Sequence, residues 1–131
     1  DNGHLIMDNG QLTIKKGDNI LKQKSYSFAL EVVKACRELQ AEKEFILSKQ
    51  LLRSGTGIGA LVEEANQAES KADFIHKLSI ANKEANETQY WIRLLIDSGV
   101  INSSRGEALL KMCTELIKIL TASIKTSKLK R

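Results

Sequence analysis

The sequence contains no proline among its 131 residues, and aromatic side chains make up only 5% of it. Folds with many turns rarely do without proline, whereas long helices joined by short loops need none. No apolar run approaches the ~20 residues of a membrane-spanning helix, and no secretory signal pattern is visible at the start. We therefore expect an α-helical, cytoplasmic domain with no membrane association.

Cysteine is also scarce. Cys36 and Cys113 are the only two, they lie more than half the chain apart, and neither belongs to a Cys-x-x-Cys motif. Both occupy apolar positions of the pattern described below. We therefore expect two buried thiols in a reducing compartment, with a disulfide as the less favoured alternative.

The residues that are present suit a single helical domain. The chain is 42% hydrophobic and 27% charged, and its formal net charge is +4 at pH 7. Its length allows one core but not two. The mild positive charge permits an anionic partner without requiring one.

The first 19 residues differ in pattern from the rest. Two apolar runs flank Asn9-Gly10, a strong two-residue hairpin signal. Folding about that turn would set Met7 opposite Leu12 and Leu5 opposite Ile14. A lone hairpin is marginal in water, so residues 1–19 are either a short β-hairpin or a disordered leader.

Helical periodicity predicts four amphipathic helices from Ile20 onward. We expect them at about residues 20–42, 44–66 and 71–98, with the fourth starting at Ser104, where a capping box with Glu107 begins. Ser98-Gly99 supplies the stop of the third helix. The residues expected in the core stripes are Phe28, Val32, Ala35 and Leu39, with Ala29, Val33, Cys36 and Gln40 beside them; Leu47, Leu51, Ile58, Val62 and Ala65; Phe74, Leu78, Ala81, Ala85, Thr88, Ile92 and Leu95; and Leu109 or Leu110, Cys113, Ile117, Leu120 and Ile124. The predicted fold is all-α, an up-down-up-down four-helix bundle over residues 20–127 with a basic tail at 128–131.

Three glycines interrupt the second predicted helix, in "RSGTGIGALVEEA" at residues 53–65. Gly55, Gly57 and Gly59 imitate a dinucleotide-binding loop, but that loop follows a buried strand. Here "LSKQLLRS" precedes it, with leucines at helical spacing. We therefore interpret the three glycines as positions of close helix packing.

The segments "LLRSGTGIGALVEEA" and "FIHKLSIANKEANETQYWIRLLIDSGVI" closely resemble the small four-helix-bundle proteins encoded in intervening sequences of bacterial 23S rRNA genes. The resemblance covers about residues 24 to 124 and is most specific in "KEANETQYW". It implies a ring-like homopentamer without established catalytic activity. A related branch, the accessory proteins of diversity-generating retroelements, binds nucleic acid and a reverse transcriptase, so the resemblance also implies such a protein partner.

Arg53, Glu64, Glu84 and Glu87 fall on charged positions of that family. Glu84 and Glu87 are one helical turn apart, so both can face Arg53. We interpret the four residues as a structural ion-pair network, with an acidic site as the alternative.

Catalysis by a metal centre has little support in the sequence. A di-iron bundle needs Glu-x-x-His on two helices, and the bundle has only Asp73-x-x-His76. A magnesium-dependent nucleotide pyrophosphohydrolase uses clustered glutamates, which this chain imitates with the wrong spacing for paired ligands. Those glutamates are Glu63, Glu64, Glu69, Glu84 and Glu87. We expect no cofactor, no metal and no enzymatic activity, with the pyrophosphohydrolase as a minor alternative.

A basic stripe follows the fourth predicted helix. Lys111, Lys118 and Lys125 are spaced by seven residues, and Lys128, Lys130 and Arg131 continue the stripe. In a pentameric ring the stripe would recur five times and could hold RNA or DNA phosphates without reading bases. The alternative is a structural or protein-binding scaffold whose basic face is only solvated.

Overall fold

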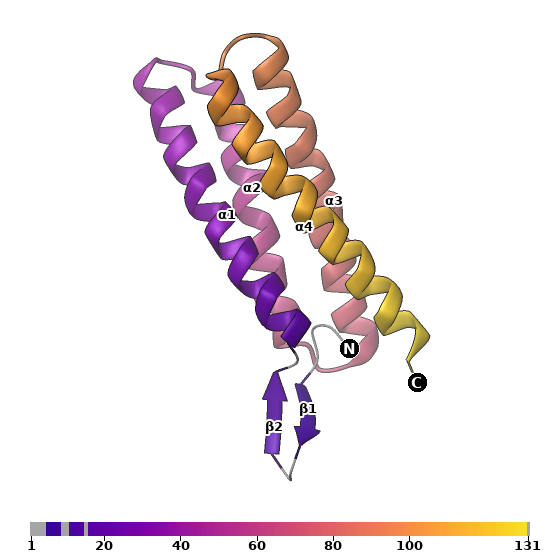
Figure 1. The fold of residues 1–131 in the computed structure, drawn as a ribbon. Coiled ribbons are helices and arrows are strands. Elements are labelled where there is room, and N and C mark those ends of the chain that lie inside the picture. Colours follow the sequence, from indigo (N-terminus) through magenta and orange to yellow (C-terminus); the bar gives the residue numbers. More distant parts are fainter. Residues whose placement is uncertain (1–4, 9–10, 15, 131) are drawn as a thin grey trace.

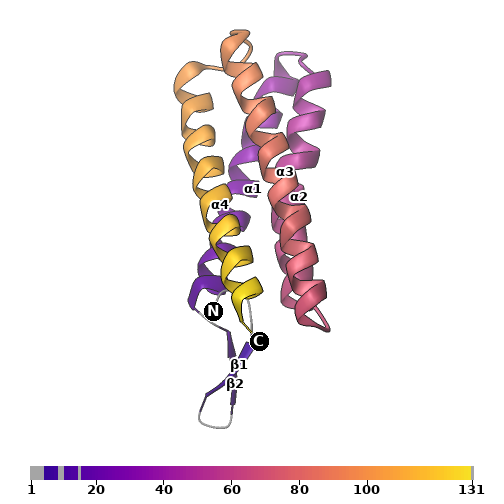
Figure 2. The ribbon, with the colours of Figure 1, turned by 90° about the vertical axis from the view of Figure 1, so that its right-hand side faces the viewer.

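The computed structural model describes residues 5–8, 11–14 and 16–130 of the chain, with side chains from residue 20 onward. It contains two short strands and four helices in the order β1, β2, α1, α2, α3, α4 (Figure 1). The helices are α1 at Lys16–Ala41, α2 at Ile46–Asn66, α3 at Lys71–Asp97 and α4 at Ser103–Leu129. Each helix runs antiparallel to the next, which confirms the predicted up-down-up-down bundle (Figure 2).

The strands β1, Leu5–Asp8, and β2, Gln11–Ile14, pair antiparallel. Their register places Leu5 opposite Ile14 and Met7 opposite Leu12, as the hairpin alternative predicts. The Asn9-Gly10 turn itself lies outside the described residues.

Helix α1 begins at Lys16 rather than near Ile20, so four residues assigned to the leader are helical. The sequence Lys16-Gly-Asp-Asn19 carries no apolar residue. A helical turn without an apolar position leaves no periodic signal, which explains the difference.

The start of α4 also differs from the prediction. Its N-cap is Asn102, whose Oδ1 accepts a hydrogen bond from the backbone N–H of Arg105 at 3.1 Å. The predicted capping box from Ser104 to Glu107 was therefore wrong, because α4 begins at Ser103 and Asn102 is its cap. Both Asn and Ser are favoured caps, so residue type alone does not decide between Asn102 and Ser104.

One stripe of each helix forms a continuous core. All seven expected positions of α3 are buried, from Phe74 to Leu95. In α4, Leu109, Cys113 and Leu120 are buried as predicted, but Leu116 and Ser123 are buried in place of Ile117 and Ile124, which only pack against the core from its edge. Leu47 of α2 is likewise at the edge with Ser48 buried beside it, and Val33 of α1 is exposed because it lies on the outer side of that helix.

Three polar side chains inside the core make hydrogen bonds across helices, whereas the buried hydroxyls of Ser123 and Ser127 in α4 have no hydrogen-bond partner among the described residues. The Thr88 hydroxyl lies 2.9 Å from the Ser54 hydroxyl and joins α3 to α2. Cys36 Sγ donates to the Ser48 carbonyl, and Cys113 Sγ donates to the Ala85 carbonyl. Both cysteines are free and buried, and burial raises their thiol pKa values to about 11 for Cys36 and about 12 for Cys113.

Candidate nucleic-acid interface

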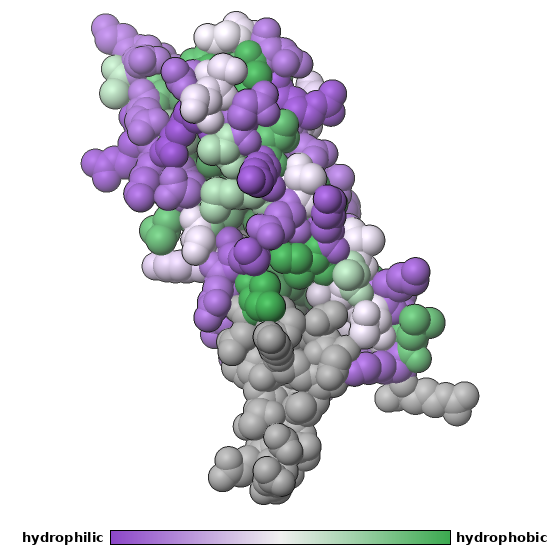
Figure 3. Space-filling view, in the orientation of Figure 1, coloured by the Kyte–Doolittle hydropathy of each residue, from purple (hydrophilic) through white to green (hydrophobic). Residues whose placement is uncertain are grey.

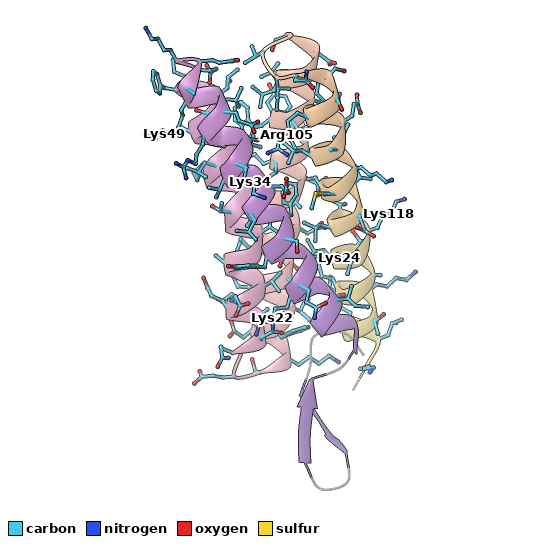
Figure 4. The ribbon with its side chains drawn as sticks, turned by 60° about the vertical axis from the view of Figure 1, so that its left-hand side comes forward. Lys22, Lys24, Lys34, Lys49, Arg105 and Lys118 are labelled. Atoms are coloured by element: carbon cyan, nitrogen blue, oxygen red, sulfur yellow. The ribbon has the colours of Figure 1, made fainter. Side chains whose placement is uncertain are left out.

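The lysines of the predicted basic stripe lie along the solvent-facing side of α4. Lys111, Lys118, Lys125 and Lys128 are all exposed, and Lys118 points away from the bundle (Figure 4). A spacing of seven residues gives a rise of about 10.5 Å per step, so the first three lysines span about 21 Å. We call these four residues the α4 lysine face.

Within the described part of the chain, no side chain of the α4 lysine face makes an ion pair. Other lysines of the bundle do. Lys22 lies 3.7 Å from Glu63 and Lys24 lies 3.3 Å from Glu115. The ammonium groups of the α4 lysine face are therefore available to an external anion.

The second half of α4 has no local negative charge to offset these lysines. Residues 116–130 contain four lysines and no aspartate or glutamate. Lys128 and Lys130 can also stabilise the helix, because cations near a helix C-terminus interact favourably with the helix dipole. Lys111 and Lys118 are too far from that end for the same reason to apply. Lys130 is exposed, and Arg131 lies outside the described residues.

The first half of the face is of mixed charge. A surface depression of ≈ 500 Å³ lies along this half of the face and is lined by Glu107, Leu110, Lys111, Thr114, Glu115 and Lys118. Glu115 already pairs with Lys24 of α1. Across the surface that α1 and α4 present, hydrophilic residues predominate, with hydrophobic patches between the two helices (Figure 3).

Three of the four residues of the predicted ion-pair network meet on the α2–α3 surface. Arg53 Nη1 donates to Glu84 Oε1 at 3.3 Å, and Arg53 Nη2 donates to Glu87 Oε2. Trp91 Nε1 donates to the same Glu87 oxygen at 2.9 Å. The hydrogen bond from Trp91 and then the one from Arg53 hold the pKa of Glu87 below its ordinary value.

Glu64 does not join this cluster. It lies eleven residues from Arg53 on α2, about 16 Å along the helix axis, and it accepts a hydrogen bond from Lys77 Nζ at 3.0 Å. This hydrogen bond raises the pKa of Lys77. The predicted network is therefore two separate links between α2 and α3.

The sequence did not point to an ion-pair cluster that joins α4 to α1. Arg105 Nη1 donates to Glu31 Oε1 at 2.9 Å, and Arg105 Nε donates to Glu38 Oε1 at 3.3 Å. The hydrogen bond from Arg105 is the main reason that the pKa of Glu31 lies below its ordinary value. The seven-residue spacing of Glu31 and Glu38 is the signal that could have shown a common acidic stripe.

The glycines of α2 are not equivalent. A Cβ at Gly55 would lie 2.9 Å from Val32 Cγ2, and one at Gly59 would lie 3.4 Å from the Ser25 carbonyl oxygen, so both face α1 closely. A Cβ at Gly57 would meet only Glu84, at 3.9 Å, which is ordinary contact. The close-packing interpretation therefore does not hold for Gly57, because its position on the helix turns it away from α1.

The carboxylates of the pyrophosphohydrolase alternative are mostly engaged with cations. Glu63, Glu64, Glu84 and Glu87 each lie within 4 Å of a lysine or arginine nitrogen. Among the described residues, no three His, Cys, Asp or Glu side chains come together in a group that could hold a metal ion. None of the helices in the described part of the chain is long and apolar enough to cross a membrane.

The chain matches a family model described as "23S rRNA-intervening sequence protein" over residues 17–122. Among solved structures, it is similar to a protein with unknown function from the S23 ribosomal protein family of Bacteroides thetaiotaomicron VPI-5482. The two share 50% sequence identity with a TM-score of 0.81, over 83% of this chain and 98% of that chain. No match is found among curated proteins.

Proposed function

The chain belongs to the 23S rRNA-intervening sequence protein family, and on that premise we propose that it is a non-catalytic, self-associating helical protein that binds the nucleic-acid backbone. The observation that carries the proposal is the α4 lysine face. Its four ammonium groups are exposed and make no ion pair within the described residues. Phosphate binding by such a face is electrostatic and independent of base sequence.

The test is a salt titration of nucleic-acid binding with a charge-matched control. The variant changes Lys111, Lys118 and Lys125 to Gln. Loss of three phosphate contacts should reduce the slope of log K against log salt by about one per lysine. Fluorescence anisotropy with labelled RNA and DNA measures this slope.

The matched control changes Lys43, Lys83 and Arg93 to Gln, which removes the same charge from other parts of the surface. These three cations are also exposed, and the structure records no ion pair for them in the described chain. If the affinity falls equally in both variants, the change in net charge alone explains the loss, and the assignment of nucleic-acid binding to α4 is overturned.

Self-association is the second part of the proposal. Of the seven exposed large hydrophobic side chains in the described residues, five lie on α1 or at the start of α2: Tyr26, Leu30, Val33, Phe45 and Ile46. A groove of ≈ 240 Å³ between α1 and α2 runs beside Tyr26 and is lined partly by Ala29, Thr56, Gly59 and Ala60. Small residues beside an apolar ridge suit the packing of another helix.

A second copy of the chain offers a complementary surface. Arg37 and Lys49 border the α1–α2 face, whereas Asp97 lies at the end of α3, and all three are exposed. The Arg105–Glu38 hydrogen bond places the end of α1, which carries Arg37, beside the start of α4, a few residues after Asp97. Side-by-side contact between unlike faces is heterologous, and it produces a ring when the rotation closes.

Light scattering tests this surface. Leu30→Glu combined with Val33→Glu should convert the assembly to monomer, because two charges would be buried in an apolar contact. Leu129→Glu is the control, since Leu129 is more exposed but lies at the end of α4. A monomeric wild type, or a double variant with wild-type mass, would contradict the proposal.

The competing function is a protein-binding scaffold without nucleic-acid binding. The same apolar α1–α2 face favours it, because contiguous exposed apolar surface marks interaction sites. The salt titration separates the two functions: a scaffold would keep its assembly state and show no lysine-dependent binding of RNA or DNA.

A further inference from the structure

The α4 lysine face is charged but has no surface on which a base could stack. Residues 103–129 contain no Phe, Tyr, Trp or His. The side chains of these types that are exposed in the described part of the chain are Tyr26, Phe45, His76 and Tyr90, which lie on α1, before α2 and on α3. Proteins that bind single strands combine a cationic groove with aromatic side chains that stack successive bases.

Tyr90 is committed to another side of the bundle. Its ring packs edge-on against Trp91, with ring centroids 5.1 Å apart. Trp91 in turn donates to Glu87, which pairs with Arg53 of α2. The Tyr90–Trp91 pair therefore belongs to the α2–α3 surface and is not part of the α4 lysine face.

The face also lacks the side chain that most often reads bases. Arginine recognises guanine through two hydrogen bonds, whereas lysine acts as a point charge. The arginine of α4, Arg105, is held by Glu31 and Glu38. The four residues of the face are all lysines, so it can bind phosphates but has little means to read bases.

The geometry favours a stiff polyanion over a flexible one. The lysines lie on one helix and project along a straight line of about 21 Å. A duplex presents about one charge per 1.7 Å of its axis and is already straight on this length scale. A single strand has a lower charge density, and its ordering would lower the conformational entropy without stacking to offset the loss.

We infer that the α4 lysine face binds double-stranded nucleic acid through its phosphates, in preference to single strands and without base selection. This inference rests on the proposed function and names the partner of the same face.

The experiment compares a duplex DNA and a duplex RNA of about 20 base pairs with an oligothymidylate and an oligouridylate that carry the same number of phosphates, across a salt series. The expected result is at least about tenfold tighter binding of a duplex than of either single strand, with two unrelated duplex sequences within about twofold of each other. Comparing the affinities for the RNA duplex and the DNA duplex tests whether the protein prefers A-form or B-form geometry. Lys111, Lys118 and Lys125 changed together to Gln should abolish the duplex preference.

The outcomes separate the two proposals. If neither duplex nor single strand binds in a lysine-dependent manner, the proposed function fails. If single strands bind as tightly as duplexes, the inference alone fails. A Tyr90→Ala variant tests the physical reason for the preference: unchanged single-strand binding in that variant supports the absence of a stacking surface, whereas weaker binding would show that bases stack on Tyr90 and would overturn that reason.

Discussion

Among the glycines of α2 to α4, Gly106, in the first turns of α4, is the position where a single methyl group has the least room. A Cβ there would lie 2.5 Å from Ile96 Cγ1 and 3.0 Å from Ile101 Cγ2. The sequence around it gave no sign of this contact, because Gly106 stands alone, whereas the cluster in α2 drew attention to Gly57. Close approach depends on the neighbouring element, and a single sequence does not contain that information.

Gly106→Ala should therefore lower the free energy of unfolding by about 1–3 kcal/mol, the range for overpacked cores. Gly57→Ala is the control: it has ordinary space next to Glu84 and should raise stability by about 0.5–1 kcal/mol, because alanine favours helices. Urea denaturation of both variants measures the difference. A neutral Gly106→Ala would contradict the close contact with Ile96.

Glu31 makes stability depend on pH. Its pKa lies below its ordinary value of 4.5 in the folded chain, mainly because of Arg105. A lowered folded pKa gives stability that is present above the unfolded pKa and is lost as the pH falls through the folded value. Glu31→Gln should therefore cost up to about 1 kcal/mol at neutral pH, the upper end for exposed ion pairs, and nothing once the pH is below the lowered pKa of Glu31 in the folded chain.

Denaturation at neutral and at acidic pH checks this prediction. Glu107→Gln is the matched control, because Glu107 is exposed on α4 and makes no ion pair in the described chain. An equal loss at both pH values would mean that Glu31 stabilises through packing rather than charge.

Helix α4 shows which features of an element follow from its sequence. Its existence and length follow from apolar residues at every turn, but these occur in adjacent pairs such as Leu109-Leu110 and Leu116-Ile117. Neighbouring positions differ by about 100° around a helix, so each pair leaves the buried face undecided. In the structure, Leu116 and Ser123 are on the buried face of α4. Helix α3 has a less ambiguous stripe, and its whole buried face was predicted.

The cap of α4 gives a prediction at the same scale. Asn102→Ala should lower stability by about 1 kcal/mol, since it removes the acceptor for the Arg105 N–H. Ser104→Ala should have little effect, because Ser104 lies inside the helix and is exposed. Thermal unfolding of the two variants distinguishes the caps, and the reverse order would restore the capping box.

Both cysteine thiols are buried inside the four-helix bundle. Cys36 and Cys113 are at most 1% exposed, and burial raises both thiol pKa values to about 11 and about 12. The thiolate is the reactive form. A thiol reagent near pH 8 should therefore modify neither cysteine in the folded protein, and it should modify both as urea unfolds the chain.

The measurement is the number of thiols modified at each urea concentration, compared with helicity in the same samples. Coincident curves indicate one cooperative bundle. Reaction of one cysteine before the loss of helicity would show that its helix opens separately.

Ion pairs between helices were less predictable than the helix ends, and among them only the link from Arg53 had a local signal in the sequence. Arg53 with Glu84 and Glu87 follows from two glutamates one turn apart. Glu64 with Lys77, and Arg105 with Glu31, depend on the axial offset between helices. That offset is set by core packing and leaves no local pattern.

Helix α1 starts and α4 stops at the same end of the bundle (Figure 2), and the Lys24–Glu115 ion pair joins the two helices further along. A short peptide could therefore connect α4 to α1, and new termini could be opened in the α2–α3 connection at residues 67–70. Such a circular permutant would keep every helix neighbour while changing the order in which the helices are synthesised. The architecture thus separates the order of translation from the order of packing.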